Sequence, residues 1–275
     1  MTSAPVAPVL TMNDGRGIPQ LRLGVYKVPD DITAATIVAA VEAGYRHIDT
    51  ATFYANERGT GEGMRASGLD REDLFVTTKV WQDDQGFEST LRAFEQSRRL
   101  LGLDYVDLYL IHWPAPRQDR YVDTWRAMEK LLADGVVRSI GVANFHTHHL
   151  DRLMAETEVV PVVNQVELHP WLPQEAVHAY DAEHGILTEA WSPLARGRVL
   201  GDPVLDRLAA KHGVAPAQVV IRWHIERGIV VIPKSTDPER IRQNADVFGF
   251  RLDADDYAAI ASLDSGARTG NDPDD

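Results

Sequence analysis

The sequence contains no cysteine among its 275 residues. This absence excludes disulfides, cysteine nucleophiles and thiolate metal sites. The sequence also lacks any apolar run near the roughly 18 residues that a membrane-spanning helix needs. Residues 1–5 carry neither the basic region nor the apolar region of a secretion signal. We therefore expect a cytoplasmic protein that has no membrane partner.

Positive charge is scarce, because 28 Lys and Arg residues against 41 Asp and Glu residues give a net charge of −13. A field of this sign repels phosphate backbones and anionic lipids, so we expect no nucleic-acid partner. A small anion can still bind at a local basic cluster. Hydrophobic residues make up 44% of the chain, which is enough for a sizeable buried core.

Short β-branched or aromatic segments alternate with longer segments of helical periodicity, which is typical of repeated strand–helix units. The expected strands are 21–24, 47–49, 75–79, 106–111, 137–142, 162–166, 186–190 and 229–232. The expected helices are 32–43, 57–67, 88–101, 122–133, 148–156, 174–184, 203–212 and 239–247. Eight such pairs in about 250 residues predict an α/β fold of the (β/α)₈ or TIM barrel type. A doubly wound sheet usually stops at about five to seven strands.

Other segments predict additions to this barrel. Residues 9–19, with a tight turn at Asn13-Asp14-Gly15, predict an N-terminal β-hairpin that closes the bottom of the barrel. Residues 215–226 and 254–263 predict two extra helices. Residues 264–275 are rich in Gly and Asp, which predicts a short mobile tail. We expect the whole chain, 1–275, to form one domain.

Local signals predict where some helices begin. Asp31 is expected to cap the helix that starts at residue 32, since an aspartate oxygen can accept the first free N–H groups. Pro238 suits the first turn of the last barrel helix, where its missing N–H is not needed.

Ionisable residues follow three consecutive expected strands. Asp49 ends the second strand and Tyr54 comes five residues later, whereas Lys79 ends the third strand and His112 follows the fourth. The carboxyl ends of barrel strands meet at one rim, where the active sites of such barrels lie. We therefore expect these four side chains to lie together.

These four residue types suit proton transfer by a buried phenol. A tyrosine has an ordinary pKa of about 10 and needs a nearby cation to stabilise its phenolate. Lys79 can be this cation for Tyr54, and Asp49 can balance the charge of the buried ammonium group. His112 can hydrogen-bond the substrate and orient its reacting oxygen. The alternative is a Lys79–Asp49 ion pair with a structural role only.

Three motifs, in the same order along the chain, resemble signatures of the aldo-keto reductase family. They are Gly44-Tyr45-Arg46-His47-Ile48-Asp49-Thr50-Ala51 with Tyr54, Asn56 and Glu57; Leu110-Ile111-His112-Trp113-Pro114; and Ile232-Pro233-Lys234-Ser235-Thr236 followed by Arg240 and Asn244. The resemblance extends from about residue 13 to residue 263 and is strongest to the bacterial 2,5-diketo-D-gluconate reductases. It implies a barrel enzyme that reduces an aldehyde or ketone to an alcohol with NADPH.

The resemblance also implies roles for the residues at the rim. Tyr54 would be the general acid, Lys79 and Asp49 would tune it, and His112 would orient the carbonyl while a nicotinamide gives hydride. Family members that reduce carbon–carbon double bonds in steroids carry a glutamate in place of this histidine. The presence of His112 therefore favours carbonyl reduction.

A basic cluster follows the eighth expected strand, where Lys234, Ser235 and Thr236 precede a helix that carries Arg240. Cations, hydroxyl groups and a helix N-terminus suit a phosphate monoester, although such a cluster also occurs on solvated surfaces. The resemblance makes this cluster the site of the 2′-phosphate of NADPH. It implies further cofactor contacts, namely Asn244 beside the adenine, Trp191 on the nicotinamide, Ser192 and Leu194 near the pyrophosphate, and Asn144 and Gln165 at the carboxamide.

The sequence departs from the family pattern at two positions. Ala143 stands where the family generally has serine, which removes one hydroxyl contact to the cofactor, and Arg22 stands where a glycine is usual. A different pattern, Gly61-Glu62-Gly63-Met64-Arg65-Ala66, fits a loosened dinucleotide fingerprint but lies inside an expected helix. We interpret that match as chance.

Three histidines, His146, His148 and His149, lie together without a cysteine or carboxylate at metal-ligand spacing, so we predict no metal site. The aromatic residues Tyr26, Trp81 and Trp113 are expected to line a substrate pocket, with ordinary rim packing as the alternative. The short segment 115–124 predicts an open site for a small polar carbonyl compound, such as a keto-sugar acid.

Family members are often monomers, and the resemblance implies a monomer here. Two other functions stay open from the sequence. One is a lyase that forms a Schiff base on Lys79. The other is a non-catalytic nicotinamide-binding subunit that regulates a partner protein.

Overall fold

The structure is a computed structural model of the chain that describes residues 7–275. Eight parallel strands form one sheet in the order β3 to β10. They are β3 (Leu23–Gly24), β4 (His47–Asp49), β5 (Phe75–Val80), β6 (Val106–Ile111), β7 (Val137–Ala143), β8 (Val163–Glu167), β9 (Leu187–Trp191) and β10 (Val230–Ile232). Leu21 pairs with Val231, and the N–H of Arg22 donates to the Val231 carbonyl at 3.1 Å. These contacts close the sheet into the predicted barrel.

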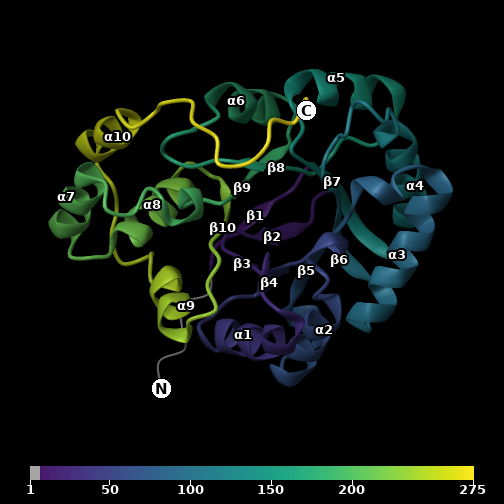
Figure 1. Cartoon of the computed structure of the whole chain (residues 1–275), viewed down its shortest axis with the longest axis horizontal. Coiled ribbons are helices and arrows are strands. Elements are labelled where there is room, and N and C mark those ends of the chain that lie inside the picture. Colours follow the sequence, from purple (N-terminus) through teal and green to yellow (C-terminus); the bar gives the residue numbers. More distant parts are fainter. Residues whose placement is uncertain (1–6) are drawn as a thin grey trace.

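Helices follow the strands and surround the sheet (Figure 1). The barrel helices are α1 (Asp30–Glu42), α2 (Glu57–Ala66), α3 (Phe87–Leu101), α4 (Tyr121–Ala133), α5 (Thr147–Glu156), α6 (Glu175–Glu183), α7 (Pro203–His212) and α9 (Pro238–Ala245). The two extra helices are present as predicted, as α8 (Pro216–Glu226) and α10 (Ala254–Ala261). Within residues 7–275, no helix combines the length and the apolar character needed to cross a bilayer.

The predicted cap at Asp31 is wrong, because α1 already begins at Asp30 and Pro29 is its N-cap residue. The fixed φ of Pro29 gives it the extended conformation that an N-cap residue needs. The Asp30 carboxylate instead accepts the N–H of Gly59, at 2.8 Å, and so joins the start of α1 to α2. Pro238 lies in the first turn of α9, as predicted.

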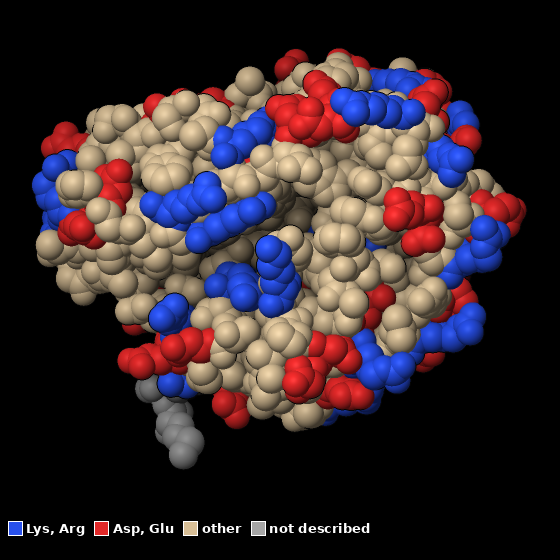
Figure 2. All heavy atoms as spheres, viewed as in Figure 1, with Lys and Arg blue, Asp and Glu red and all other residues tan. Residues whose placement is uncertain are grey.

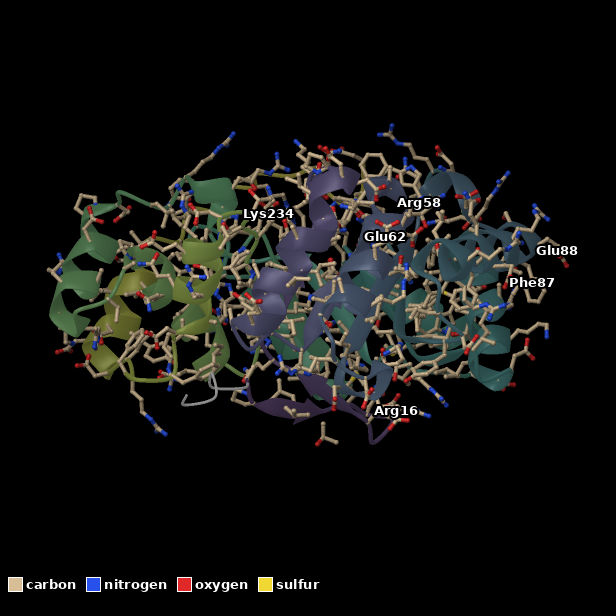
Figure 3. All side chains as sticks on the ribbon, turned by 90° about the horizontal axis from the view of Figure 1, so that it is seen from below. Arg16, Arg58, Glu62, Phe87, Glu88 and Lys234 are labelled. Carbon is tan, nitrogen blue, oxygen red and sulfur yellow. The ribbon has the colours of Figure 1, made fainter. Side chains whose placement is uncertain are left out.

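The N-terminal hairpin pairs β1 (Val9–Thr11) with β2 (Gly17–Pro19) in antiparallel register. Its apolar side chains pack against the interior of the barrel, in a cluster that includes Met12, Ile18, Leu108, Leu110 and Val230. Figure 3 places Arg16, beside β2, at the opposite end of the barrel from Lys234, which follows β10. The hairpin therefore covers the amino end of the barrel, as predicted.

Helix α2 packs closely against its neighbours through Gly61 and Gly63, the glycines of the pattern that fits a loosened dinucleotide fingerprint. A Cβ atom on Gly63 would lie 2.8 Å from the Ile37 Cβ of α1, and one on Gly61 would overlap the Leu101 carbonyl of α3. Glycine is required here because helix backbones approach each other directly. The glycine pattern thus has a structural explanation in helix packing.

Residues 264–275, for which the sequence predicts mobility, pack against the barrel in the structure. This segment runs from α10 back toward α5 (Figure 1, yellow). The buried Glu167 carboxylate accepts the N–H of Thr269 at 2.6 Å and the N–H of Gly270 at 3.0 Å. Composition suggests mobility, but an acceptor far away in the sequence supplies hydrogen-bond partners for the backbone of this segment.

Candidate active site

A pocket of about 1300 Å³ opens at the carboxyl ends of the barrel strands. Figure 2 shows Lys and Arg side chains around a hollow on this face. The basic residues that line the pocket are Lys27, Arg117, Arg196, Lys234 and Arg240. Pockets for a single small ligand usually measure about 300–1000 Å³, so this one can hold a dinucleotide together with a small substrate. Its cations favour an anionic ligand despite the net charge of −13.

The structure brings nearly all the predicted site residues into this pocket. Those that line it are Tyr26, Asp49, Tyr54, Trp81, His112, Trp113, Asn144, Gln165, Trp191, Ser192, Leu194, Lys234, Ser235, Arg240 and Asn244. Lys79 is fully buried and lies behind Asp49 instead of at the pocket surface. Thr236 is exposed to solvent and is not part of the lining.

Lys79 is held by its neighbours on the adjacent strand β4. Its ammonium group donates to the two carboxylate oxygens of Asp49, at 2.6 and 2.7 Å, and to the carbonyl of Thr50 at 2.9 Å. The Tyr54 hydroxyl lies farther away, at 3.5 Å from the same nitrogen. Burial lowers the pKa of Lys79, and Asp49 opposes this effect. The ion pair therefore keeps a buried cation next to the phenol.

Tyr54 ends a single helical turn, η1 (Thr52–Tyr54), that directly follows β4. Burial, followed by the negative charge of Asp49, raises the pKa of Tyr54 well above its usual value. The phenol therefore keeps its proton near neutral pH. This environment suits a residue that donates a proton to a substrate oxygen.

His112 lies beside this phenol at the end of β6. The ring centroids of His112 and Tyr54 are 5.5 Å apart, with the rings nearly perpendicular. Burial, and then the charge of Lys79, hold the pKa of His112 well below its usual value. The imidazole is therefore neutral and can donate one N–H while it carries no charge.

Asn56, which was not among the predicted site residues, fixes the two loops that carry the pocket tyrosines. Its amide nitrogen donates to the carbonyls of Val25, at 2.8 Å, and Val28, at 3.0 Å, on either side of Tyr26. Its amide oxygen accepts the hydroxyl of Thr50 at 2.8 Å. Its place in the first motif, two residues after Tyr54, could have indicated that Asn56 belongs to the site.

Aromatic rings form the wall around the phenol. The ring centroids of Tyr26 and Tyr54 are 5.0 Å apart, and Phe53 stacks on Trp81 at 3.9 Å. Phe53 is half exposed and extends the wall that was predicted from Tyr26, Trp81 and Trp113. Its position next to Tyr54 in the chain could have indicated it.

Asn144 joins the histidine to the strand-end indole. Its amide nitrogen donates to the His112 carbonyl at 2.8 Å, and its amide oxygen accepts the indole N–H of Trp191 at 2.8 Å. On the next strand, the amide nitrogen of Gln165 donates to the Glu189 carboxylate at 3.1 Å. These contacts fix the orientation of both amides before any ligand binds.

The basic end of the pocket includes an aspartate that caps helix α9. The Asp237 carboxylate accepts the first free N–H groups of α9, those of Glu239 at 2.8 Å and Arg240 at 3.3 Å. This aspartate cap engages N–H groups that could otherwise bind a phosphate, so the contribution of the helix N-terminus to phosphate binding stays a prediction. The side chains of Lys234 and Arg240 still face the pocket as cations.

The tail forms a wall of the pocket that the sequence did not predict. Its residues 270–273 line the cavity. A Cβ atom on Gly270 would lie only 2.5 Å from the Trp191 ring, so the tail backbone packs directly on the indole. Although burial alone would raise the pKa of Glu167, hydrogen bonds from His169 and Thr269 lower it to about 2. Glu167, as a carboxylate at the end of a strand, could have indicated from the sequence that this rim binds another segment.

The three histidines at the start of α5 contact the same tail. The Nε2 atoms of His146 and His148 lie 3.1 Å from carboxylate oxygens of Asp272 and Asp274, respectively. The carboxylates missing from the local sequence thus come from the tail. His149 accepts the N–H of His146 on Nδ1, which places its own proton on Nε2, the atom that faces Asp274. A protonated nitrogen cannot ligate a metal, which argues against His149 as a ligand. The absence of a metal site stays a prediction.

Comparisons with known proteins agree with this geometry. A sequence profile of the Aldo/keto reductase family matches residues 17–265. An aldo-keto reductase of Mycolicibacterium smegmatis is 53% identical over 268 residues, which cover 98% of each chain. The methylglyoxal reductase DkgA of Salmonella typhimurium is 52% identical over 268 residues, or 97% of each chain.

Solved structures give the same result. The apo crystal structure of Gox0644 superposes with a TM-score of 0.94 at 50% identity, and the alignment covers 98% of both chains. A variant of Gox0644 in complex with NADPH gives the same TM-score, identity and coverage. On the evidence of its barrel, its four clustered rim residues and these matches, the chain belongs to the aldo/keto reductase family.

Proposed function

We propose that this protein reduces a small polar aldehyde or ketone, such as a keto-sugar acid, to an alcohol with NADPH. The observation that carries the proposal is the placement of a protonated Tyr54 beside Lys79 and a neutral His112 at the floor of the pocket. The named activities of DkgA, a methylglyoxal reductase, and the NADPH complex of Gox0644 support it.

In this proposal the substrate oxygen lies between Tyr54 and His112. The hydride comes from NADPH when that cofactor is bound. Tyr54 donates its proton to the oxygen as negative charge develops there, and the N–H of His112 holds the oxygen in place. Lys79 then stabilises the phenolate, while Asp49 keeps Lys79 in position.

The residues present fit NADPH at both ends of the pocket. Lys234 and Arg240 can hold a phosphate by charge, and Ser235 and Asn244 lie on the same part of the lining. At the other end, the indole of Trp191 offers a flat apolar face for the nicotinamide, and Gln165 offers an amide for the carboxamide. Ser192 and Leu194 line the part of the pocket after β9, where we place the pyrophosphate.

The test is a spectrophotometric assay of NADPH consumption with a panel of carbonyl compounds that includes methylglyoxal and keto acids. We expect turnover with small polar members of the panel. Tyr54→Phe should lower kcat by about 100-fold or more while the dissociation constant of NADPH stays nearly unchanged. An absence of turnover with every compound, despite tight NADPH binding, would instead support a regulatory subunit.

A borohydride-trapping experiment separates the proposal from a Schiff-base lyase. Lys79 has no exposed surface and its nitrogen is engaged by Asp49 and Thr50, which disfavours attack on a substrate. Borohydride should therefore trap no substrate on Lys79.

A further inference from the structure

Arg22 is a fully buried arginine inside the barrel. It lies between Leu21, which pairs with Val231, and β3. Its backbone N–H donates to the carbonyl of Val231, so this residue is part of the closure of the sheet. A buried guanidinium carries a large cost of desolvation unless carboxylates or other acceptors compensate it. The groups around the guanidinium of Arg22 therefore show which part of the site it stabilises.

The guanidinium contacts groups on three different strands. Its Nη1 atom lies 2.5 Å from a carboxylate oxygen of Glu189 on β9, and its Nη2 atom lies 3.0 Å from an oxygen of Asp49 on β4. Nη1 is also 3.3 Å from the His47 ring on β4 and 3.5 Å from the Thr77 hydroxyl on β5. Arg22 therefore bridges two buried carboxylates that approach it from separate strands.

Four of the buried ionisable groups form a balanced set around Arg22. Arg22 and Lys79 supply two cations, and Asp49 and Glu189 supply two carboxylates. Without Arg22, the two carboxylates would share one ammonium group in a nearly dry environment. Burial raises the pKa of Glu189 to about 7 even with Arg22 present, and Arg22 is the strongest influence in the opposite direction. Arg22 thus favours the charged form of Glu189.

Each carboxylate contacts a residue from a different half of the site: Asp49 from the proton-donating half, and Glu189 from the cofactor-binding half. Asp49 holds Lys79, which contacts the Tyr54 hydroxyl. Glu189 accepts the amide N–H of Gln165, which lines the pocket. We propose that Arg22 is a positioning residue that holds Asp49 and Glu189 together and so couples the proton-donating half of the site to the cofactor-binding half. This inference rests on the proposed function for the roles of both halves.

Arg22 also acts on the phenol through its charge. The groups that influence Tyr54 come from several elements: burial raises its pKa most, Asp49 and Tyr26 raise it further, and Arg22 lowers it. His112 faces the phenol as a neutral ring, and Lys79 is paired with Asp49. Loss of Arg22 should therefore raise the pKa of Tyr54 and lower its phenolate fraction. Oxidation of an alcohol needs this phenolate, whereas carbonyl reduction needs the protonated phenol.

The experiment compares Arg22→Met with the double variant Arg22→Met/Glu189→Gln. The double variant removes one charge of each sign, which protects it from the misfolding that an unpaired carboxylate could cause. Arg22→Lys tests whether a positive charge alone restores the alcohol oxidation rate and the affinity for NADPH. The control is Arg71→Met/Asp107→Asn, which removes another partly buried ion pair, of 2.6 Å, that does not line the active-site pocket.

We expect both Met variants to oxidise an alcohol about tenfold more slowly at alkaline pH, since one unit of pKa changes the phenolate fraction tenfold. The KM of the alcohol should change little, so the loss should appear in kcat. The dissociation constant of NADPH should rise about threefold or more, because the side chain at position 189 loses the Arg22 contact that holds it in place against Gln165. Arg22→Lys should recover part of the oxidation rate, and the control variant should match the wild type in both measurements.

Two results would overturn the inference. One is a folded double variant with the oxidation rate and NADPH affinity of the wild type. The other is an equal loss in the control variant, which would indicate a general effect of lost stability. If the wild-type protein reduces no carbonyl compound, the proposed function fails, while the NADPH affinities still decide whether Arg22 supports the cofactor half.

Discussion

The ammonium group of Lys79 contacts both carboxylate oxygens of Asp49, at 2.6 and 2.7 Å. The Tyr54 hydroxyl is 3.5 Å from the same nitrogen, so the ammonium charge interacts more strongly with the carboxylate than with the phenol. Tyr54 therefore keeps its proton in the ligand-free protein, in agreement with the raised pKa that burial and Asp49 give it.

This relationship predicts the pH dependence of the reaction. An acid with a raised pKa stays protonated to higher pH, and a histidine with a lowered pKa stays neutral to lower pH. The kcat of carbonyl reduction should therefore be nearly constant from about pH 5 to pH 8 and fall only at alkaline pH. A fall in rate centred near the ordinary histidine pKa of about 6.5 would show instead that His112 changes its charge.

The basic end of the pocket predicts the cofactor preference. Lys234→Met and Arg240→Met should each raise the dissociation constant of NADPH by about tenfold or more, since each removes a charge-assisted contact to phosphate. The affinity for NADH, which lacks the 2′-phosphate, should change little. Arg242→Met, an exposed position on the same helix α9 that does not line the pocket, is the matched control. Equal losses for both cofactors would contradict this assignment.

The contact between the tail and Trp191 predicts that a single added methyl group weakens NADPH binding. Gly270→Ala would bring its Cβ to 2.5 Å from the indole, which has to move. We expect the dissociation constant of NADPH, measured by quenching of tryptophan fluorescence, to rise about threefold to tenfold. Gly249→Ala, at a glycine with no atom within 4 Å of the added Cβ, should leave it unchanged. Wild-type affinity in Gly270→Ala would mean that the tail moves away readily.

Helix packing predicts a change in stability without a change at the active site. Gly63→Ala should lower the free energy of unfolding by about 1–3 kcal/mol, because the added methyl group overpacks the contact between α1 and α2. Urea denaturation of this variant and of Gly249→Ala gives the comparison. A wild-type midpoint for Gly63→Ala would show that α2 can shift outward at little cost.

Much of the fold follows from local sequence patterns. Strands 47–49 and 106–111 were predicted with the bounds that the structure gives, because each is a short segment with β-branched or aromatic residues between segments of helical periodicity. The rim residues Asp49, Lys79 and His112 were found for the same reason, since the end of an apolar run marks the end of a strand. Their roles in catalysis, the single domain, the monomeric state and the cytoplasmic location stay predictions.

Contacts between distant segments account for what the sequence did not reveal. The tail looks mobile by composition, and only the folded barrel places Glu167 where it binds Thr269 and Gly270. Arg22 appears in the sequence as an isolated departure from the family pattern. Its meaning depends on Glu189, which reaches it only because the first and last strands close the barrel.

The hairpin that covers the amino end of the barrel also has an electrostatic consequence. Its residues Met12 and Ile18 form an apolar layer with Leu108 and Leu110, which shields the buried charges from water at this end of the barrel. Asp49 lines the pocket at the opposite end, where a bound ligand displaces water. Ligand binding then lowers the local dielectric around Arg22 and Lys79, and each charge acts more strongly in the assembled complex than in the free protein.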